Sequence, residues 1–198
     1  MARNPSVREG GRRDEIVAQA VALFNAKGYA GTSVNDIADA LGLSKPALYH
    51  YIQRKEDVLY WIHEDFARLL IEKLESRLEE PRPMRNQLQD VVRDILALML
   101  THRDYVRVYF EHFRALDDER QAEIAVQRNY YRHLVQSIIE RGIVGGEFRA
   151  LDPGVTTTSI FGMCNWAYQW YDPAGPLSNL EVADTMFDLL LGGLESRS

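Results

Sequence analysis

A glycine between two short amphipathic stretches, within residues 33–51, constrains the fold of this chain more than any other feature. The first stretch repeats apolar residues at helical spacing, at Val34, Ile37, Ala38 and Leu41. Gly42 permits a left-handed turn, and a second stretch with Leu48 and Tyr51 on its apolar side follows. The pattern predicts a helix-turn-helix. An ordinary helical hairpin is the alternative, but a bare hairpin has no reason to gather Lys45, Tyr49 and His50 on its outer side.

Capping residues mark where these helices begin. Either Thr32 or Ser33 is expected to cap the first helix, and Ser44 the second, with Pro46 in its first turn, where a missing N–H costs nothing. A preceding helix is expected from Arg13 to Gly28, because its apolar residues also recur at helical spacing. The three helices together predict a small N-terminal head over residues 13–55, preceded by a disordered basic arm at 1–12.

The remainder, residues 56–198, shows only helical periodicity. An apolar stripe begins after Lys55 and continues to Leu78, before Pro81 and Pro83. Further helices are expected over 88–100, 105–113, 118–142, 155–171 and 178–195, and the helix over 88–100 is apolar enough to be buried on several sides. No segment alternates as a strand does. The sequence therefore predicts an all-α fold of about nine helices, a three-helix head followed by a C-terminal helical bundle.

The net charge of −6 is unevenly distributed along the chain. Through Lys55 there are eight Lys or Arg against five Asp or Glu, an excess of +3, which leaves −9 for the rest. A cationic head on an acidic body is compatible with nucleic-acid binding, although an excess of this size also suits an ordinary solvated surface.

Cellular location and redox state follow from what the sequence contains. It has no apolar run of about eighteen residues and no apolar N-terminal segment, so we expect a cytoplasmic protein without a membrane partner. The one cysteine, Cys164, stands among apolar and aromatic residues. We expect a buried, reduced thiol, with a redox sensor as the alternative.

Candidate catalytic groups occur in no recognisable motif. They are His102, Asp104, Glu111, His112, His133 and Cys164. The sequence contains no nucleophile elbow, no phosphate-binding glycine loop and no zinc-binding His-Glu-x-x-His. We therefore expect no enzyme activity, no cofactor and no metal site. A helical interaction protein that does not use its helix-turn-helix is the other alternative.

The N-terminal motif resembles a known family. The residues that carry the resemblance are Gly28-Tyr29, Thr32-Ser33-Val34, Asp36-Ile37-Ala38, Leu41-Gly42-Leu43-Ser44-Lys45, Leu48-Tyr49-His50-Tyr51 and Lys55-Glu56. They are similar to the N-terminal domain of tetracycline-repressor-like (TetR-type) transcription regulators. The chain departs from the usual pattern at Ile52, where an aromatic residue is common, and at Arg54, where a small polar residue is common.

The resemblance implies a homodimer that binds double-stranded operator DNA, one recognition helix per subunit. The implied DNA-binding residues are Ser33, Ser44, Lys45, Ala47, Tyr49, His50 and Lys55. Ser33 and Lys55, at helix starts, are expected to hold phosphates. Lys45 and Ala47 are expected to contact base edges, and Tyr49 and His50 the flanking backbone. Arg8 and Arg12 of the arm are candidates for the minor groove.

The C-terminal half resembles TetR-type repressors of fatty-acid and steroid catabolism. The similar segments are Gly146-Glu147-Phe148-Arg149, Asn165-Trp166, Trp170-Tyr171-Asp172-Pro173 and Gly175-Pro176-Leu177-Ser178. The resemblance implies a body, residues 56–198, that dimerises and binds a small apolar effector, such as an acyl-coenzyme A thioester, that releases the repressor from DNA. Hydrophobic drugs are the alternative effectors.

An apolar tunnel with cationic residues at its mouth would suit such an effector. The expected lining residues are Leu96, Leu100, Tyr109, Phe113, Tyr130 and Trp166. The expected phosphate-binding residues are Arg103 and Arg107, with Arg114, Arg128 and Arg132 as further candidates. The alternative is that the aromatic residues form the bundle core and the arginines a solvated face.

The last two helices are the implied dimer interface. Their apolar stripes comprise Ile160, Phe161, Met163, Ala167, Met186, Phe187, Leu190, Leu191 and Leu194. Two helices from each subunit would form a four-helix interface.

Overall fold

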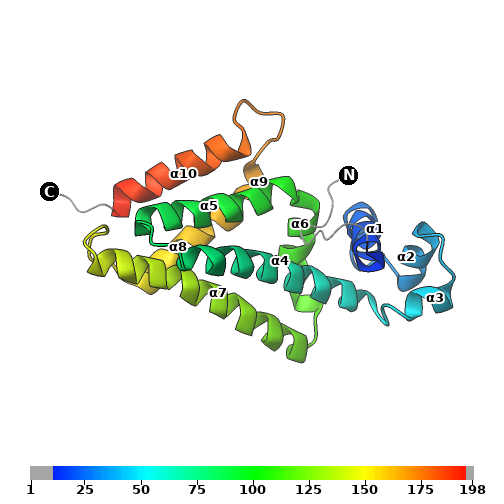
Figure 1. The fold of residues 1–198 in the computed structure, drawn as a ribbon. Coiled ribbons are helices and arrows are strands. Elements are labelled where there is room, and N and C mark those ends of the chain that lie inside the picture. The colour runs from blue at the N-terminus through cyan, green and yellow to red at the C-terminus, as the bar shows by residue number, and fades with distance from the viewer. Residues whose placement is uncertain (1–10, 195–198) are drawn as a thin grey trace. The chain divides into compact units, whose positions relative to one another are not determined.

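The computed structural model describes residues 11–194, and within that range it contains helices and no strand (Figure 1). The helices are α1 (Arg12–Lys27), α2 (Val34–Ala40), α3 (Lys45–Tyr49), α4 (Lys55–Leu78), α5 (Met84–Thr101), α6 (Arg103–Glu111), the 3-10 helix η1 (Phe113–Ala115), α7 (Asp118–Val144), α8 (Pro153–Asn165), α9 (Ala167–Trp170) and α10 (Asn179–Leu194). The predicted all-α fold, with a helix-turn-helix head followed by a helical body, is confirmed. Most of the expected arm, including Arg3 and Arg8, lies outside the described residues.

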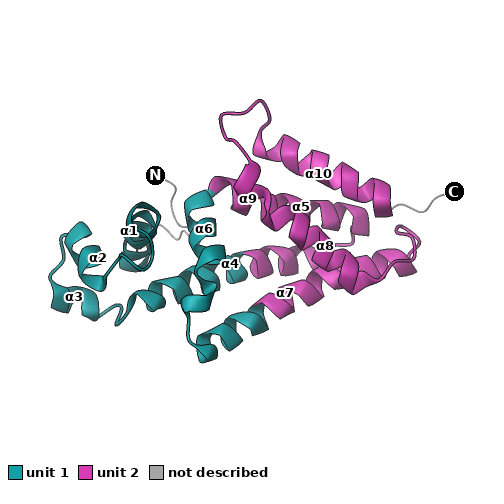
Figure 2. Ribbon diagram, turned by 180° about the vertical axis from the view of Figure 1, so that it is seen from behind, with its two compact units in different colours: residues 1–69, 102–127 teal, residues 70–101, 128–198 magenta. Residues whose placement is uncertain are grey.

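The described chain divides into two compact units (Figure 2). Unit 1 contains residues 11–69 and 102–127, and unit 2 contains residues 70–101 and 128–194. Two of the three boundaries fall inside continuous helices, α4 and α7, and the third lies between α5 and α6. Unit 1 therefore adds to the head the first part of α4, all of α6 and the first part of α7. The predicted functional division at residue 55 stays a prediction, because compactness alone does not assign function.

The core of the N-terminal head, within unit 1, is built on one face of α1. Ile16, Val17 and Ala20 are fully buried there, together with Ile37 of α2 and Leu48 of α3. These residues recur at the three- and four-residue spacing that places side chains on one helix face. The short helices α2 and α3 are thus held by the apolar residues that the sequence pattern identified.

The choice between Thr32 and Ser33 as the cap of α2 is resolved in favour of Ser33. Its hydroxyl accepts a bond from the Asp36 amide at 3.2 Å, and the Asp36 carboxylate accepts one from the Ser33 amide at 2.8 Å. This is a capping box. Thr32 is buried instead, and its hydroxyl donates to the Gly28 carbonyl at 2.9 Å.

Unit 2 is organised on α5, which packs against α8, α9 and α10. Its buried residues include Leu88, Val92 and Leu96, all without exposed surface. Buried side chains occur around much of the helix, at Met84, Gln87, Leu88, Val91, Val92, Ile95, Leu96, Leu98, Met99 and Leu100. The prediction that this helix is buried on several sides is confirmed.

Two expected helices are interrupted. The helix expected over 155–171 breaks at Trp166, whose amide bonds to the Cys164 carbonyl instead of continuing the α-helical ladder, so α8 and the short α9 are separate. The aromatic helix ends at Glu111, and Phe113 lies in η1. No helix among the described residues has the length and apolarity needed to cross a membrane.

Candidate functional site

Helix α3 and the turn before it present the predicted polar surface. Gly42 has a φ of +63°, and the Leu43 amide donates to the Ala38 carbonyl at 2.9 Å, which closes the turn after α2. Ser44 then caps α3 by accepting a bond from the Ala47 amide at 3.4 Å. Leu48 is the one buried residue of this five-residue helix. Leu48 thus anchors the helix in the core of the head, and the side of the helix away from Leu48 is exposed.

The predicted DNA contacts on α3 lie on that open side. Lys45, Tyr49 and His50 are exposed, and Ala47 is half-buried. The structure therefore brings together an ammonium, a methyl group, a phenol and an imidazole on one short helix. These groups match what base edges and phosphates offer in a major groove.

Ser33 is also exposed, at the start of α2. Its hydroxyl lies 2.5 Å from an Asp36 oxygen, and Lys27 pairs with the other Asp36 oxygen at 2.9 Å. These bonds hold the pKa of Asp36 well below its usual range, with the bond from Ser33 as the largest cause. The Ser33 amide and hydroxyl, which were expected to hold a DNA phosphate, are thus already bonded to the Asp36 carboxylate.

Lys55 has a different environment from the one expected of a phosphate ligand. Its ammonium donates to the carbonyls of Tyr29 at 2.6 Å and Thr32 at 3.0 Å, and lies 4.3 Å from the centre of the Tyr29 ring. The side chain thereby fastens the turn between α1 and α2 to the start of α4. The prediction that Lys55 holds a phosphate is untested, and in this structure its ammonium is occupied by protein carbonyls.

Of the expected effector residues, Tyr109 and Phe113 lie together in unit 1, around a histidine that sequence reasoning missed. His63 has no exposed surface, and its ring centre lies 4.2 Å from that of Tyr109 and 5.3 Å from that of Phe113. The Phe66 ring also packs edge-on against Tyr109, with ring centres 5.3 Å apart. The burial of His63 could have been predicted from the sequence, because His63 lies between Leu59 and Phe66 on the apolar stripe of α4.

The other expected lining residues differ in exposure. Leu96 and Leu100, in unit 2, are buried. Tyr130 is 46% exposed with its hydroxyl donating to Glu75 at 2.6 Å, and Trp166 is 62% exposed. The prediction that Tyr130 and Trp166 line an effector tunnel stays a prediction, and in this structure both side chains are open to solvent.

The expected phosphate-binding arginines are placed on α6 and α7. Arg103 is half-buried and Arg107 exposed on α6, while Arg114 is exposed in η1. Arg128 and Arg132 are half-buried on α7, and Arg132 contacts a ring nitrogen of His133 at 2.8 Å. The side chains that the sequence grouped for one anion thus come from several helices of both units.

The histidines considered as catalytic groups have different surroundings. His112 stacks on Tyr29 with ring centres 4.9 Å apart, and burial lowers its pKa, aided by the charge of Lys55 against the opposing effect of Glu111. His102 occupies the position before α6 without a capping bond from its side chain, and His133 is exposed on α7. In the part of the chain that the structure describes, no three or more His, Cys, Asp or Glu side chains are arranged to hold a metal ion.

Cys164 is fully buried in α8, as expected of a structural thiol. Burial raises its pKa to about 12. Since the thiolate is the reactive form, the thiol has the properties of an inert apolar side chain and not of a redox sensor.

The residues expected at a dimer interface are mostly buried within one chain. Ile160, Ala167, Phe187, Leu191 and Leu194 have at most 5% exposed surface and belong to the core of unit 2. The same C-terminal region has a second apolar set that remains open to solvent. Its members are Val155, Trp166, Trp170, Leu177, Leu180 and Leu189. The buried members of the stripes are thus removed from the predicted interface, whereas Phe161, Met163 and Leu190 are half-buried and remain available to a partner together with the second set.

The capped helix-turn-helix with its exposed polar face defines the class of protein, a DNA-binding regulator with a helical body. Two family models match the chain. Residues 16–60 match the N-terminal model of the tetR family of bacterial regulatory proteins, and residues 81–194 match a tetracyclin repressor-like C-terminal domain. The chain belongs to the TetR family of transcriptional regulators.

Individual relatives agree over almost the whole length. The chain is 27% identical to the transcriptional repressor KstR2 of Mycolicibacterium smegmatis over 98% of its own residues and 96% of that protein. A TetR/AcrR-family regulator of Thermobifida fusca shares 33% identity and has a TM-score of 0.74, covering 92% of this chain and 97% of that one. The structure of AibR with isovaleryl coenzyme A and operator DNA has 29% identity and a TM-score of 0.80, over 91% and 98% of the two chains.

Proposed function

We propose that this regulator is a homodimeric, cytoplasmic repressor that binds a pseudo-palindromic operator through α3 and is released by an acyl-coenzyme A thioester. The observation that carries the DNA-binding part is the capped α3, anchored by Leu48 and exposing Lys45, Tyr49 and His50. Two copies would place two such helices in successive major grooves, with half-sites about 34 to 36 Å apart. The protein acts in this scheme by binding and not by catalysis.

Roles on the DNA are assigned by chemistry. Lys45 donates to guanine and Ala47 contacts a thymine methyl group, while Tyr49 and His50 hold flanking phosphates. Ser33 and Ser44 contribute hydroxyls at two helix starts. Lys55 contributes in this proposal by fixing the α1–α2 turn and through the positive end of α4, because its ammonium is already bonded to carbonyls.

The dimer is supported by the exposed apolar set of the C-terminal helices. Trp166, Trp170 and Leu189 are 62%, 53% and 71% exposed in the single chain. Large aromatic and aliphatic side chains open to water on adjacent helices are typical of a surface that a partner covers. A second copy of the chain is the partner that the family implies.

The effector proposal rests on the similarity to AibR, whose structure holds isovaleryl coenzyme A, and on the apolar residues of each unit. Tyr109 and Phe113 surround His63 in unit 1, and Leu96 and Leu100 are buried in unit 2. Arg103 and Arg107 of α6 are the candidates for the phosphates of coenzyme A. Effector binding would favour a state in which the two heads no longer match the half-site spacing, and DNA would in turn weaken effector binding by the same factor.

The DNA proposal is tested by a gel shift on the DNA upstream of the protein's own gene, as a function of salt. We expect a shift that weakens steeply as salt rises, because phosphate contacts release counterions. Lys45→Ala should lower affinity and relax base preference, whereas Tyr49→Ala should weaken binding to all sequences alike. Absence of a shift even at low ionic strength would refute operator binding at this DNA.

The effector proposal is tested separately. Native mass spectrometry of protein purified from its own host should reveal a retained acyl-coenzyme A. Isovaleryl coenzyme A, added to the protein–DNA complex, should release DNA if the effector site accepts short acyl chains. Binding of a thioester without any change in operator affinity would contradict the coupling, because the two equilibria must affect each other equally.

A further inference from the structure

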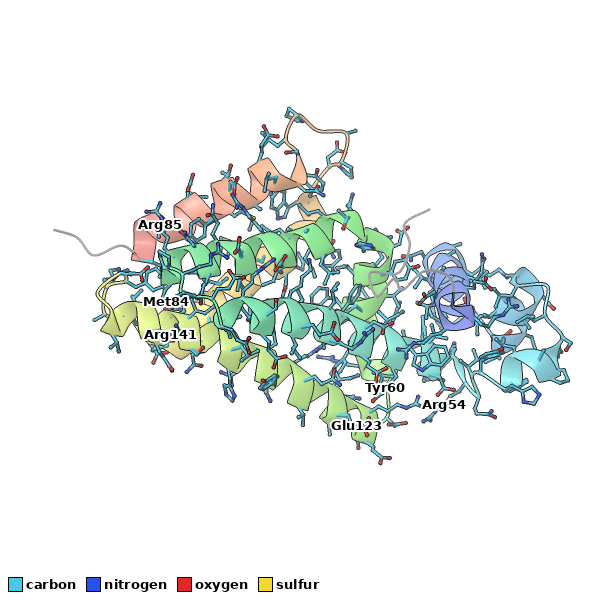
Figure 3. The ribbon with its side chains drawn as sticks, viewed as in Figure 1. Arg54, Tyr60, Met84, Arg85, Glu123 and Arg141 are labelled. Atoms are coloured by element: carbon cyan, nitrogen blue, oxygen red, sulfur yellow. The ribbon has the colours of Figure 1, made fainter. Side chains whose placement is uncertain are left out.

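The starts of α4 and α7 are fastened to each other by two reciprocal ion pairs within unit 1. The Arg54 guanidinium lies 2.6 Å from an oxygen of Asp117, and the Arg120 guanidinium lies 2.6 Å from an oxygen of Asp57. Each helix thus contributes one arginine and one aspartate, three residues apart. Figure 3 shows Arg54 together with Tyr60 and Glu123 where the two helices begin. We call Arg54, Asp57, Asp117 and Arg120 the reciprocal clamp.

Each aspartate of the clamp also accepts backbone amides at the start of its own helix. One oxygen of Asp57 accepts the amides of Gln53 at 2.6 Å and Arg54 at 2.9 Å, while its other oxygen takes Arg120. Asp117 accepts the Arg120 amide at 3.0 Å with one oxygen and Arg54 with the other. A displacement of either helix start therefore disturbs the backbone bonds of its own cap as well as the ion pair.

The clamp continues along the two helices. Arg120 lies 5.4 Å from the ring centre of Tyr60, and the Tyr60 hydroxyl bonds to Glu123, which raises the pKa of Tyr60. Although burial favours the protonated form of Asp57, the bonds from Arg54, Arg120 and Gln53 hold its pKa below the usual value. The charged form of the clamp is the stable one at neutral pH.

On its other side, the clamp connects directly to the recognition helix. Between the end of α3 and Arg54, the amides of Tyr51 and Ile52 donate to the Leu48 carbonyl at 2.8 and 3.1 Å. The Gln53 side chain donates to the Tyr49 carbonyl at 2.5 Å, and Ile52 is 1% exposed. Because these bonds constrain the short segment between α3 and α4, a change in the position of Arg54 also displaces Tyr49.

We infer that the first turn of α7 is a positioning element for DNA recognition, with Asp117 and Arg120 acting on α3 through Arg54 and Asp57. This rests on the proposed operator binding. Neither α7 residue need touch DNA in this scheme.

The test uses Asp117→Asn, because asparagine retains the capping oxygen and removes only the charge that holds Arg54. Simple electrostatics predicts a gain in affinity shared by operator and non-specific DNA, which leaves the ratio of the two affinities unchanged, whereas the clamp predicts a fall in that ratio. Losing a negative charge should strengthen binding to any DNA, whereas losing the clamp should lower the ratio of operator affinity to non-specific affinity, by up to about five-fold for a pair of this exposure. Fluorescence anisotropy on operator and scrambled duplexes measures both affinities.

A matched control is available in unit 2. Arg93 and Asp184 join α5 to α10 at 2.7 Å with 37% exposure of each side chain, similar to the 51% and 37% of Arg54 and Asp117. Asp184→Asn should leave the ratio of operator to non-specific affinity unchanged. Equal effects of Asp117→Asn and Asp184→Asn on that ratio, or a rise for Asp117→Asn, would overturn the inference.

Hydrogen exchange provides a second measurement that needs no DNA. In Asp117→Asn, amides of residues 49–54 should exchange faster than in the wild type, while those of α10 stay unchanged. Unchanged exchange in residues 49–54 would contradict the clamp. If Asp117→Asn does not fold, Arg54→Gln, on the partner side chain, is measured in the same way.

The two proposals fail in different ways. If the wild type does not bind its upstream DNA, the operator duplex is taken from a random pool selected by the wild-type protein. If the pool yields no sequence, operator binding is refuted and hydrogen exchange alone decides on the clamp. If the wild type binds and Asp117→Asn keeps the full affinity ratio, the clamp is refuted and operator binding stands.

Discussion

The recognition helix α3 and the central helix α5 are fixed in opposite ways. Of the five residues of α3, one side chain is buried, whereas α5 has ten buried side chains among eighteen residues. The position of α5 is determined by its own side chains. That of α3 depends on contacts made by its neighbours, above all the reciprocal clamp and Lys55. Sequence-specific DNA binding should therefore be sensitive to polar substitutions outside α3, and the stability of the protein to apolar substitutions in α5.

The largest expected effect is on the α5 side of this comparison. Leu88 has no exposed surface, so Leu88→Ala should lower the free energy of unfolding by about 2–5 kcal/mol. Denaturant titration measures this change. Val126→Ala on α7, where the side chain is 69% exposed, is the control and should change the free energy of unfolding by less than about 0.5 kcal/mol. A similar loss in both variants would mean that α5 is not the stabilising centre of unit 2.

Close packing in unit 2 predicts a second effect, at Gly142 near the end of α7. A Cβ added there would lie 2.2 Å from the Phe148 ring, so Gly142→Ala should destabilise the protein by about 1–3 kcal/mol despite the higher helix propensity of alanine. Gly162 of α8 is the matched control, because nothing lies within 4 Å of its added Cβ. Gly162→Ala should be neutral or stabilising by up to about 1 kcal/mol. Thermal unfolding of both variants decides whether contact or propensity dominates.

The sequence predicted those parts of the structure that depend on local patterns. Ser33, Gly42 and Ser44 set the helix-turn-helix through capping and turn chemistry, which act over three or four residues. The break at Trp166 was missed because the residues on both sides of it favour one continuous apolar helix.

The sequence did not predict contacts between residues far apart in the chain. Asp117 is 63 residues from Arg54, and no local pattern pairs them. Helical periodicity also identifies the apolar face of a helix, but it does not say whether another helix of the same chain or a second chain covers that face. For that reason Phe187 was assigned to the dimer surface although it is 1% exposed, and Trp166 to an interior although it is 62% exposed.

The third prediction concerns Lys55, on the α3 side of the comparison. Lys55→Met keeps the aliphatic part of the side chain but removes the ammonium that bonds to the carbonyls of Tyr29 and Thr32. We expect a loss of about 1–2 kcal/mol in the free energy of unfolding, near the lower end of the range for hydrogen bonds of a charged group, because Lys55 is half-buried. Operator and scrambled DNA should lose affinity together, because the whole head and not one base contact is affected. If affinity falls and stability is unchanged, Lys55 instead binds a phosphate directly, as the family resemblance implied.

The smallest expected effect is a dependence of stability on pH that comes from His112, beside the same turn. In an unfolded chain a histidine has a pKa of about 6.5, and burial against Tyr29 lowers that of His112 in the folded protein. Between the two pKa values the unfolded chain therefore binds more protons than the folded one, so the free energy of unfolding falls as the pH drops below about 6.5. The folded pKa values of Asp36, Asp57 and Asp117 are lowered, so the stability that these residues contribute is lost only in more acidic solution, below the ordinary aspartate pKa of about 3.9.

Denaturant titrations at pH 7.5 and 5.5 should show a smaller difference for His112→Gln than for the wild type, whereas His133→Gln, at an exposed site, should behave like the wild type. A wild-type difference that persists unchanged in His112→Gln would show that the stacking on Tyr29 does not exclude the charged imidazole.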